Sequence, residues 1–281
     1  MNAVAHGSLH AASLFSVAGK HALITGGGRG IGEILSRALV ANGAHVYITS
    51  RSEETLRRTA AALTALGPGT CTALPPADLT TDAGCRGAAA ALASRQPRLD
   101  ILINNSGASW GASMEAFPEA AWDRVLALNL KTPFLLLRAC MPLLEAAAAA
   151  GGGPSRVVYV GSIVGLRPQG APTYPYEASK AALHALTVKL AGELAPRITV
   201  NALAPGYVPT RMSRGLLAYG PEDALRRAIP MGRFGSAADI GGAALFLCSE
   251  AGAWVTGTVL TVDGGSTAKP LALVAPAEDA A

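Results

Sequence analysis

The chain has 281 residues, half of them apolar and 15% charged, and a net charge of +4. This composition supports a large buried core and excludes a disordered chain. The basic residues are scattered singly, and no apolar run reaches the roughly 18 residues that span a bilayer, so neither a nucleic acid nor a membrane is an expected partner.

Four cysteines occur without the close spacing of a metal or disulfide motif: Cys71, Cys85, Cys140 and Cys248. They indicate free thiols in a reducing compartment, so we expect no metal site and a cytoplasmic location. Residues 1–17 and 267–281 are predicted to be flexible tails. The first of these lacks the cationic start and apolar run of a secretory signal, while a role in organelle targeting stays open.

From residue 21 onward, short apolar runs alternate with helical patterns. The runs predict strands at 21–26, 45–50, 71–78, 99–105, 156–162, 198–204 and 259–263, the third weakened by two prolines. Helices are predicted over 31–42, 53–66, 82–94, 119–149 and 173–189. Continuous apolar strands are typical of a parallel sheet buried on both faces, and the alternation indicates a doubly wound α/β sheet. Because no linker interrupts the pattern, residues 18–266 are predicted to form a single Rossmann-type domain.

The glycine-rich stretch T-G-G-G-R-G-I-G joins the first strand to the first helix. Glycines there permit a tight turn and bring backbone N–H groups and the helix N-terminus close to a pyrophosphate. In this position the stretch predicts a dinucleotide site. Its candidate contacts are Thr25, Gly26, Gly28, Arg29, Gly30, Ile31 and Gly32.

The end of the second strand indicates which dinucleotide binds. An acidic residue there would accept a hydrogen bond from the ribose 2′-hydroxyl, whereas arginine suits a 2′-phosphate. The chain has Ser50 and Arg51 and no acid before Glu53, and Arg29 adds a second positive charge. NADPH is therefore the expected cofactor. The alternative is that both arginines are solvated surface residues.

Polar residues also follow the third and fourth strands. Asp78 could accept a hydrogen bond from the adenine amino group or cap the next helix, and Leu79 beside it is a further candidate contact. Asn104, Asn105 and Gly107 end the fourth strand. They are expected at the carboxyl edge of the sheet, where open α/β sheets bind ligands.

A predicted helix carries Tyr176 and Lys180, four residues apart and therefore on one face. An ammonium beside a phenol favours the phenolate, so Lys180 is expected to lower the pKa of Tyr176 and to make it a proton donor or acceptor near neutral pH. Tyr174 lacks the lysine spacing and is expected to pack or to line a substrate pocket.

Four motifs occur in order on the expected elements: T-G-x-x-x-G-x-G from Thr25, N-N-S-G from Asn104, Ser162 after the fifth strand, and Y-x-x-x-K from Tyr176. Through them, residues 18–266 resemble the short-chain dehydrogenase/reductase superfamily. Three shorter stretches resemble its β-ketoacyl reductases, most closely the rhamnolipid-biosynthesis type: S-W-G-A (109–112), S-K-A-A-L-H (179–184) and P-M-G-R-F-G (230–235). The chain departs from the family where the usual N-N-A-G is N-N-S-G and where prolines reshape the loop before Tyr176.

The resemblance implies a role for each site residue. Tyr176 would be the general acid in reduction, and Lys180 would lower its pKa and bind the nicotinamide ribose. Ser162 would hydrogen-bond the substrate carbonyl oxygen, and Asn129 would hold a water that feeds a proton relay. Contacts to the nicotinamide end of the cofactor are implied for a later segment, at Pro205, Gly206, Val208 and Thr210. A homotetramer or homodimer is implied for the assembly.

Asn129 has support from the residues themselves. Pro133 lies four residues later in the same predicted helix and has no N–H to donate to the Asn129 carbonyl. That carbonyl is then free to bind a water, and the helix is expected to kink. An ordinary proline kink is the alternative.

Residues 207–235 are predicted to form a substrate loop, with a pair of short helices as the alternative. Its apolar side chains suit an acyl chain: Met212, Leu216, Leu217, Tyr219, Ile229 and Met231. Trp110 and Gln169 are candidates for the pocket or for packing, and the stretch Ser236–Asp239 predicts a helix cap.

Together these residues predict NADPH-dependent reduction of a ketone. The expected substrate is a 3-oxoacyl thioester of acyl carrier protein or CoA. Two alternatives stay open, a secondary-alcohol or polyol dehydrogenase acting oxidatively and a dinucleotide-binding regulator without catalysis. The complete set of serine, tyrosine, lysine and asparagine argues against the regulator.

Overall fold

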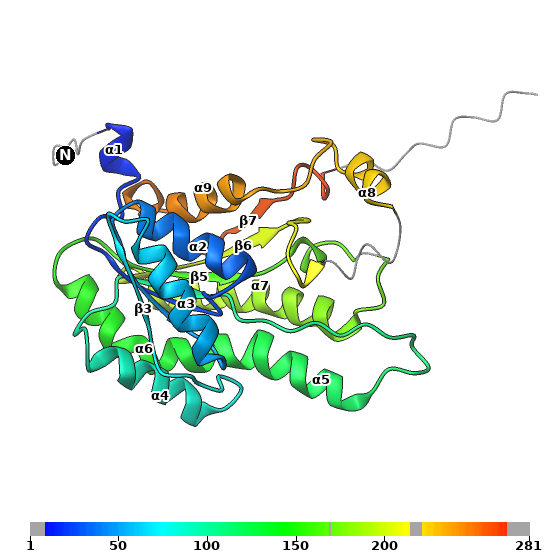
Figure 1. The fold of residues 1–281 in the computed structure, drawn as a ribbon, viewed down its shortest axis with the longest axis horizontal. Helices are drawn as coiled ribbons and strands as arrows, with labels where there is room; N and C mark the ends of the chain where they lie inside the picture. The colour runs from blue at the N-terminus through cyan, green and yellow to red at the C-terminus, as the bar shows by residue number, and fades with distance from the viewer. Residues whose placement is uncertain (1–8, 169, 214–220, 269–281) are drawn as a thin grey trace, which may run out of the picture.

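The computed structural model describes residues 9–168, 170–213 and 221–268. Within them, seven strands form one parallel sheet in the order β3-β2-β1-β4-β5-β6-β7 (Figure 1). The strands are β1 (His21–Thr25), β2 (His45–Thr49), β3 (Thr70–Ala73), β4 (Ile101–Asn104), β5 (Ser155–Val160), β6 (Ile198–Pro205) and β7 (Val259–Val262). The predicted seven-stranded parallel sheet is confirmed.

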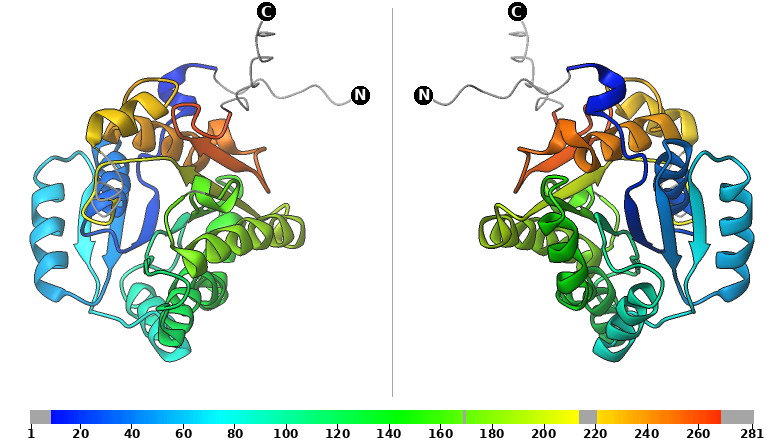
Figure 2. Two further views of the ribbon diagram at one scale, coloured as in Figure 1. Left: turned by 90° about the vertical axis from the view of Figure 1, so that its right-hand side faces the viewer. Right: turned by 90° about the vertical axis from the view of Figure 1, so that its left-hand side faces the viewer.

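Helices cover both faces of the sheet (Figures 1 and 2). One face carries α2 (Gly30–Ala41), α3 (Glu53–Thr64) and α9 (Ala237–Cys248). The other carries α4 (Asp82–Ala93), α5 (Glu119–Leu126), α6 (Thr132–Ala149) and α7 (Tyr174–Leu194). The central strands are apolar on both faces, so successive residues enter opposite cores. In β4, Ile101 and Ile103 pack under α2 and α9, while Leu102 packs under α4 and α6.

The third strand is shorter than predicted. It ends at Ala73, and the prediction of a strand through residue 78 is wrong. Leu74 N still donates to the Ile48 carbonyl at 2.9 Å, but Pro75 and Pro76 follow it and have no N–H to donate to a ladder, so the regular pairing stops before them. The chain still runs beside β2, because Ala77 N donates to the Ser50 carbonyl at 3.0 Å.

The helical segment predicted over 119–149 is interrupted by a π-helical turn, Ala127–Lys131, between α5 and α6. At Asn129, where a kink is predicted, the structure has a widened π-helical turn. By length and mean hydropathy (1.3) the whole segment could cross a membrane. In this fold, however, its apolar side chains such as Leu136 and Leu144 are fully buried against the sheet.

Regular structure is present on the amino-terminal side of the boundary predicted at residue 18. Residues Ala11–Leu14 form the short helix α1, and Val17 is fully buried in the core. At the other end, the Asp263 carboxylate accepts hydrogen bonds from the backbone of Gly265 and Thr267 at 2.9 and 2.8 Å. The rest of both predicted tails, residues 1–8 and 269–281, lies outside the described residues.

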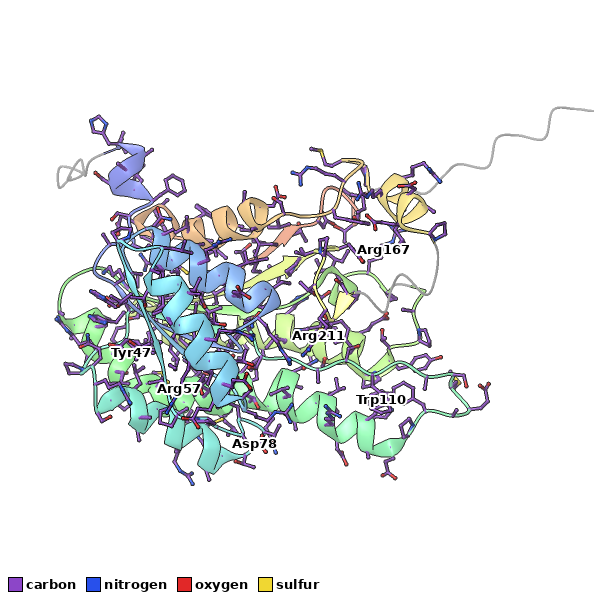
Figure 3. The ribbon with its side chains drawn as sticks, in the orientation of Figure 1. Tyr47, Arg57, Asp78, Trp110, Arg167 and Arg211 are labelled. Atoms are coloured by element: carbon purple, nitrogen blue, oxygen red, sulfur yellow. The ribbon has the colours of Figure 1, made fainter. Side chains whose placement is uncertain are left out.

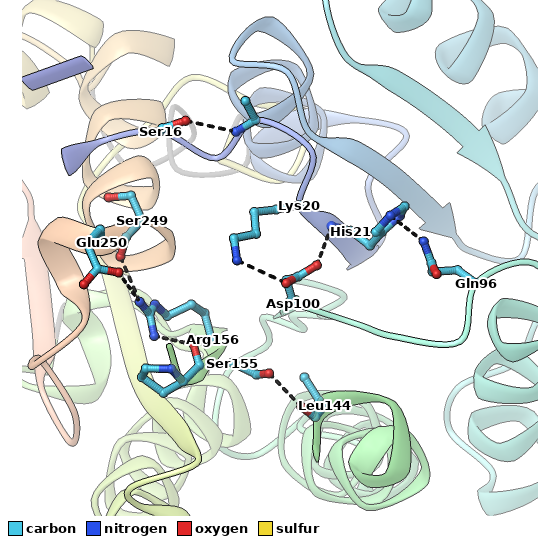
Figure 4. Close-up of polar contacts among 12 residues, drawn as sticks. Ser16, Lys20, His21, Gln96, Asp100, Leu144, Ser155, Arg156, Ser249 and Glu250 are labelled. Carbon is cyan, nitrogen blue, oxygen red and sulfur yellow. Dashed lines mark hydrogen bonds and ion pairs between the residues drawn. The ribbon is translucent and has the colours of Figure 1, made fainter. Parts of the chain in front are cut away.

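Charged residues, partly or fully buried, fasten the amino-terminal end of the sheet (Figure 4). Asp100, just before β4, pairs with Lys20 at 3.3 Å and accepts a hydrogen bond from His21 N at 2.9 Å, which ties β1 to β4. Arg156 of β5 is only 5% exposed and donates to the Ser249 carbonyl at 3.2 Å. These contacts hold strand starts together, and they lie at the opposite end from the strand termini that carry the predicted site.

Candidate active site

The glycine-rich loop closes tightly between β1 and α2. Gly26 has a φ of +64°, a conformation that side-chain-bearing residues rarely adopt. A Cβ at Gly32 would lie 2.3 Å from the Gly26 carbonyl oxygen and 2.4 Å from Asn105 Nδ2. Two of the glycines are thus required for the loop to close, and the start of α2 can approach a ligand without side chains in between.

Hydrogen bonds join this loop to the end of β4. Thr25 Oγ1 accepts from the backbone N–H groups of Asn105 and Ser106, both at 2.9 Å. The Asn105 amide donates back to the Thr25 carbonyl at 2.9 Å. Arg29, the residue that precedes α2, makes no side-chain capping bond. The first N–H groups of α2 are thereby left without a capping side chain at this edge.

Contacts with α3 and with the core fix further residues of the loop. Thr59 Oγ1 donates to the Gly28 carbonyl at 3.0 Å, and Ile31 packs on the core beneath α2. Gly30, with a φ of +54°, turns the chain into the helix. The structure therefore brings all seven predicted loop residues together at one sheet edge.

Ser50, Arg51 and Asp78 lie together beyond the end of β2. Hydrogen bonds from Thr80 lower the pKa of Asp78, and the nearby Arg51 charge lowers it further. The alternative that Asp78 caps the next helix is wrong, because Thr81 accepts the capping bond from Gly84 N at 3.0 Å. Asp78 is exposed and faces away from the core (Figure 3), whereas the neighbouring Leu79 is buried.

Ser162, Tyr176 and Lys180 meet at the carboxyl edge of β5. Ser162 follows this strand and opens a 3₁₀ turn, and its side chain is hydrogen-bonded to the Tyr176 hydroxyl. Tyr176 stands in the first turn of α7, and Lys180 one turn later is 4% exposed. The Lys180 ammonium lies 5.6 Å from the centre of the Tyr176 ring and donates to the Val160 carbonyl at 2.6 Å.

The acid–base properties of this group differ from the prediction. Burial raises the pKa of Tyr176, and the Ser162 hydrogen bond only partly opposes that rise. The prediction that Lys180 lowers the pKa of Tyr176 is wrong, because this pKa lies above its ordinary value. The physical reason is that burial disfavours the charged phenolate and is the largest cause of the shift, to which the Lys180 charge makes no resolved contribution.

Burial also lowers the pKa of Lys180 from 10.5 to about 8. Between these two values the unfolded chain binds a proton at this position that the folded chain does not. Stability at this site therefore rises with pH across that window, and below it the fold bears the cost of a buried ammonium. Measured against Lys180→Met by chemical unfolding, wild type should gain about 3 kcal/mol from pH 7.5 to 10.5. A difference that does not change with pH would show that Lys180 is solvated.

Asn129 lies in the π-helical turn and is 1% exposed. Its side chain is fully engaged. Oδ1 accepts from Ala108 N at 2.8 Å, while Nδ2 donates to the Ala108 carbonyl at 2.9 Å and to Ser179 Oγ at 3.0 Å. A Cβ at Gly107 would lie 3.4 Å from Asn129 Oδ1 and 3.9 Å from the Lys180 ammonium nitrogen. Asn129 and Lys180 thus border the same small space beside Gly107.

The segment after β6 closes over the glycine-rich loop. Gly206 follows Pro205 at the strand end, where a Cβ would lie 2.8 Å from Asp263 Cα. Val208 is 4% exposed. Thr210 lies beside the glycine-rich loop, since a Cβ at Gly30 would be 3.6 Å from the Thr210 Cβ. All the described catalytic and cofactor candidates therefore surround one edge of the sheet.

Comparison with known proteins agrees with this arrangement. The family model described as enoyl-(acyl carrier protein) reductase matches residues 26–267. The chain is 44% identical over 254 residues to the rhamnolipids biosynthesis 3-oxoacyl-[acyl-carrier-protein] reductase of Pseudomonas aeruginosa, covering 89% of this chain and 97% of that protein. It is 40% identical over 261 residues to galactitol 2-dehydrogenase (L-tagatose-forming) of Cereibacter sphaeroides, covering 91% and 98%. Its fold matches a Pseudomonas aeruginosa RhlG/NADP active-site complex with a TM-score of 0.85 at 43% identity, covering 90% and 98%.

This chain belongs to the short-chain dehydrogenase/reductase family. It is an oxidoreductase, and the resemblance first recognised from its motifs is confirmed across the sheet and its helices. The relatives act on chemically different substrates, because one is a 3-oxoacyl reductase and another a polyol dehydrogenase. Family membership therefore establishes the reaction class and leaves the substrate to the residues around the site.

The dehydrogenase/reductase site opens toward the predicted substrate loop. A cavity of about 300 Å³ lies there, lined by Tyr207, Pro209, Thr210, Arg211, Glu222, Arg226 and Phe234. Its aromatic wall is the pair Tyr207 and Phe234, whose ring centres are 4.2 Å apart. The loop contains one short helix, α8 (Glu222–Ala228), among its described residues. Leu216, Leu217 and Tyr219 lie outside them.

Of the other residues predicted to line a substrate pocket, some are exposed and others pack within the fold. Met212 and Met231 are 57% and 65% exposed, whereas Ile229 is buried. The Tyr174 ring packs edge-on against Phe117 at 5.4 Å, which supports the packing role predicted for it. Trp110, on the loop after β4, is 42% exposed (Figure 3), and Gln169 lies outside the described residues. The predicted cap at Ser236 and Asp239 is confirmed as a reciprocal pair of hydrogen bonds at the start of α9.

Sequence reasoning missed two buried residues of α7 that lie against the dehydrogenase/reductase site. Ser179 Oγ accepts from Asn129 and donates to the Tyr176 carbonyl at 2.7 Å, so it links the π-helical turn to α7. His184, four residues after Lys180, is buried behind Ser162. The signal for Ser179 was a hydroxyl between the tyrosine and the lysine, and the signal for His184 was the repeated spacing of four.

Proposed function

We propose that the chain reduces a ketone to a secondary alcohol with NADPH, and that the ketone is a 3-oxoacyl thioester. One observation carries this proposal. The Ser162 and Tyr176 side chains are hydrogen-bonded to each other at the carboxyl edge of the sheet, with Lys180 buried beside them. The glycine-rich loop lies at the same edge after β1, which is separated from β5 by β4 alone.

Each side chain has a task that its surroundings suit. Ser162 hydrogen-bonds the substrate carbonyl oxygen and stabilises the negative charge that develops there. Tyr176 donates the proton to that oxygen, and its raised pKa keeps it protonated at neutral pH. Lys180 places a positive charge next to the phenol as the proton leaves. The Asn129 carbonyl holds a water for the proton relay, since the side chain of this residue is already committed.

The dinucleotide fits the cradle that the glycines leave. Gly26 and Gly32 approach so closely that a side chain would fill the space, and the start of α2 has no capping side chain. When bound, NADPH supplies the hydride. The residues proposed to hold it are Thr25, Gly26, Gly28, Arg29, Gly30, Ile31, Gly32, Ser50, Arg51, Asp78, Leu79, Asn105, Gly107, Tyr176, Lys180, Pro205, Gly206, Val208 and Thr210.

Arg51 is proposed to select NADPH over NADH. Arg51→Ala should lower kcat/KM for NADPH about tenfold or more and leave that for NADH unchanged, because a guanidinium–phosphate hydrogen bond is lost only with the former. Initial rates with each cofactor give the ratio. Arg95→Ala serves as the matched control, since Arg95 donates to the Ala91 carbonyl at the end of α4 and should affect neither cofactor. An equal loss with both cofactors would rule out a 2′-phosphate contact.

The 3-oxoacyl thioester is favoured by the 44% identical reductase of Pseudomonas aeruginosa. The cavity beside Thr210, with its aromatic wall, provides room for part of such a substrate. Oxidation of a polyol is the second candidate, favoured by the 40% identity to galactitol 2-dehydrogenase. We further propose that the chain forms a homotetramer or a homodimer. A cytoplasmic location is also proposed, because the four buried free cysteines suit a reducing compartment.

A substrate panel tests the proposal. NADPH oxidation is followed with acetoacetyl-CoA, with the matching acyl carrier protein thioester and with simple ketones, and NADP⁺ reduction with galactitol and gluconate. We expect turnover with the 3-oxoacyl thioesters. Turnover of the polyols alone would favour the second candidate, and tight NADPH binding without any turnover would favour a regulator.

A further inference from the structure

Three residues of α7 at intervals of four face the segment that carries Ser162. They are Tyr176, Lys180 and His184, and this spacing places them on one side of the helix. The first is hydrogen-bonded to Ser162, and the second donates to the Val160 carbonyl. The third, His184, contacts this segment by packing and without a hydrogen bond.

The glycines on either side of Ser162 rest on His184. A Cβ at Gly161 would lie 2.2 Å from His184 Nε2, and one at Gly165 would lie 2.9 Å from His184 Cε1. Gly165 also approaches the helix backbone, where its Cβ would lie 2.6 Å from the carbonyl carbon of Lys180. The imidazole therefore occupies the space that two side chains would need, and Ser162 lies between these two contacts.

The His184 side chain is buried without polar partners. It is 6% exposed, and neither ring nitrogen has a hydrogen-bond partner in the part of the chain that the structure describes. Burial, reinforced by the Lys180 charge, lowers its pKa to about 4, so the ring is neutral at neutral pH. Unpaired buried nitrogens lower stability relative to an apolar side chain, so packing alone does not explain a histidine here.

We propose that His184 is a positioning residue, whose imidazole supports the turn from Gly161 to Gly165 and thereby sets where the Ser162 hydroxyl meets Tyr176. This inference rests on the proposed function for its kinetic consequence. Its structural consequence, the contact between Ser162 and Tyr176, does not depend on which substrate is reduced. Removal of the imidazole would leave a void directly behind the turn, into which the turn can relax.

The test combines His184→Ala with Ser162→Ala in a double-mutant cycle. His184→Ala should lower kcat about 10- to 100-fold, the loss expected when a reacting group is misplaced by about 1 Å. NADPH affinity, measured by its fluorescence, should change less than about twofold, since no proposed NADPH contact is removed. In the Ser162→Ala background the same change should have little further effect on kcat, because its action passes through Ser162.

A matched control separates positioning from stability. Leu190 lies on the same helix with the same 6% exposure, and Leu190→Ala leaves a void away from the site. It should lower the melting temperature about as much as His184→Ala while kcat stays unchanged. The proposal would be overturned if His184→Ala lowered kcat equally in wild type and in Ser162→Ala. It would also be overturned if Leu190→Ala lowered kcat as much as His184→Ala does.

A readout independent of turnover keeps this test apart from the proposed function. The ¹³C shift of the hydroxyl-bearing ring carbon of Tyr176, assigned with Tyr176→Phe, reports its hydrogen bond to Ser162. His184→Ala should move that shift in the same direction as Ser162→Ala does, and Leu190→Ala should not move it. If wild type reduces no ketone but the shifts behave in this way, the proposed function fails and the positioning role stands. An unmoved shift overturns the positioning role.

Discussion

Tyr176→Phe is expected to lower kcat for ketone reduction about a thousandfold. The substitution removes only the phenolic oxygen, which is the proposed proton donor, and leaves the ring beside Lys180 in place. NADPH affinity should stay within about threefold of wild type, because Tyr176 is the only proposed cofactor contact that changes and it loses a single hydroxyl. Initial-rate kinetics and fluorescence titration of NADPH measure the two quantities separately.

Tyr174→Phe is the matched control for this change. Tyr174 is 37% exposed and its ring packs edge-on against Phe117, a contact that phenylalanine retains. Activity should therefore be close to that of wild type. Substantial activity in Tyr176→Phe, or a large loss of activity in Tyr174→Phe alone, would show that Tyr176 is not the proton donor.

Gly32→Ala is expected to have the second largest effect. The added Cβ would lie 2.3 Å from the Gly26 carbonyl oxygen, and backbone at that distance has to move. We expect NADPH affinity to fall at least about tenfold and the free energy of unfolding to fall by about 1 to 3 kcal/mol. Isothermal titration with NADPH and chemical unfolding give both values.

Gly87→Ala shows what the same substitution does in a helix without the clash. Gly87 lies within α4, and a Cβ there would meet no atom within 4 Å. Alanine should stabilise the protein by about 0.5 to 1 kcal/mol and leave NADPH affinity unchanged. If Gly32→Ala behaved like Gly87→Ala, the close approach of the loop would not be needed for cofactor binding.

Most of the fold followed from local patterns. Strands buried on both faces are continuous apolar runs, and their alternation with helices leaves few possible topologies. The prediction of a strand through residue 78 is wrong, because the missing N–H groups of Pro75 and Pro76 outweigh the apolar character of this run. The cap of α4 is Thr81 and not Asp78, because the exact start of this helix depends on the loop conformation.

The members of the candidate site were predictable, but their electrostatics were not. The order of the motifs placed Ser162, Tyr176 and Lys180 at one edge, where the structure brings them together. The spacing of Tyr176 and Lys180 did not reveal that the ammonium donates to Val160, nor that burial would dominate the pKa of the phenol. Both depend on tertiary packing that no local spacing records.

His184 illustrates the same limit. Its position four residues after Lys180 is visible in the sequence, yet the spacing alone is equally compatible with a residue of the helical core. Only the distances to Gly161 and Gly165 connect it to Ser162. The repeated interval of four along α7 then becomes informative, because all three of its residues contact one short turn.

Transfer of a label tests the central claim most directly. Wild-type protein is incubated with a 3-oxoacyl thioester and NADPH carrying deuterium at both positions of nicotinamide carbon 4, and the product is examined by mass spectrometry. The account predicts a 3-hydroxyacyl thioester with one deuterium on carbon 3 for each NADPH consumed. NADPH binding with no labelled alcohol, from a thioester or from any other ketone, would contradict it.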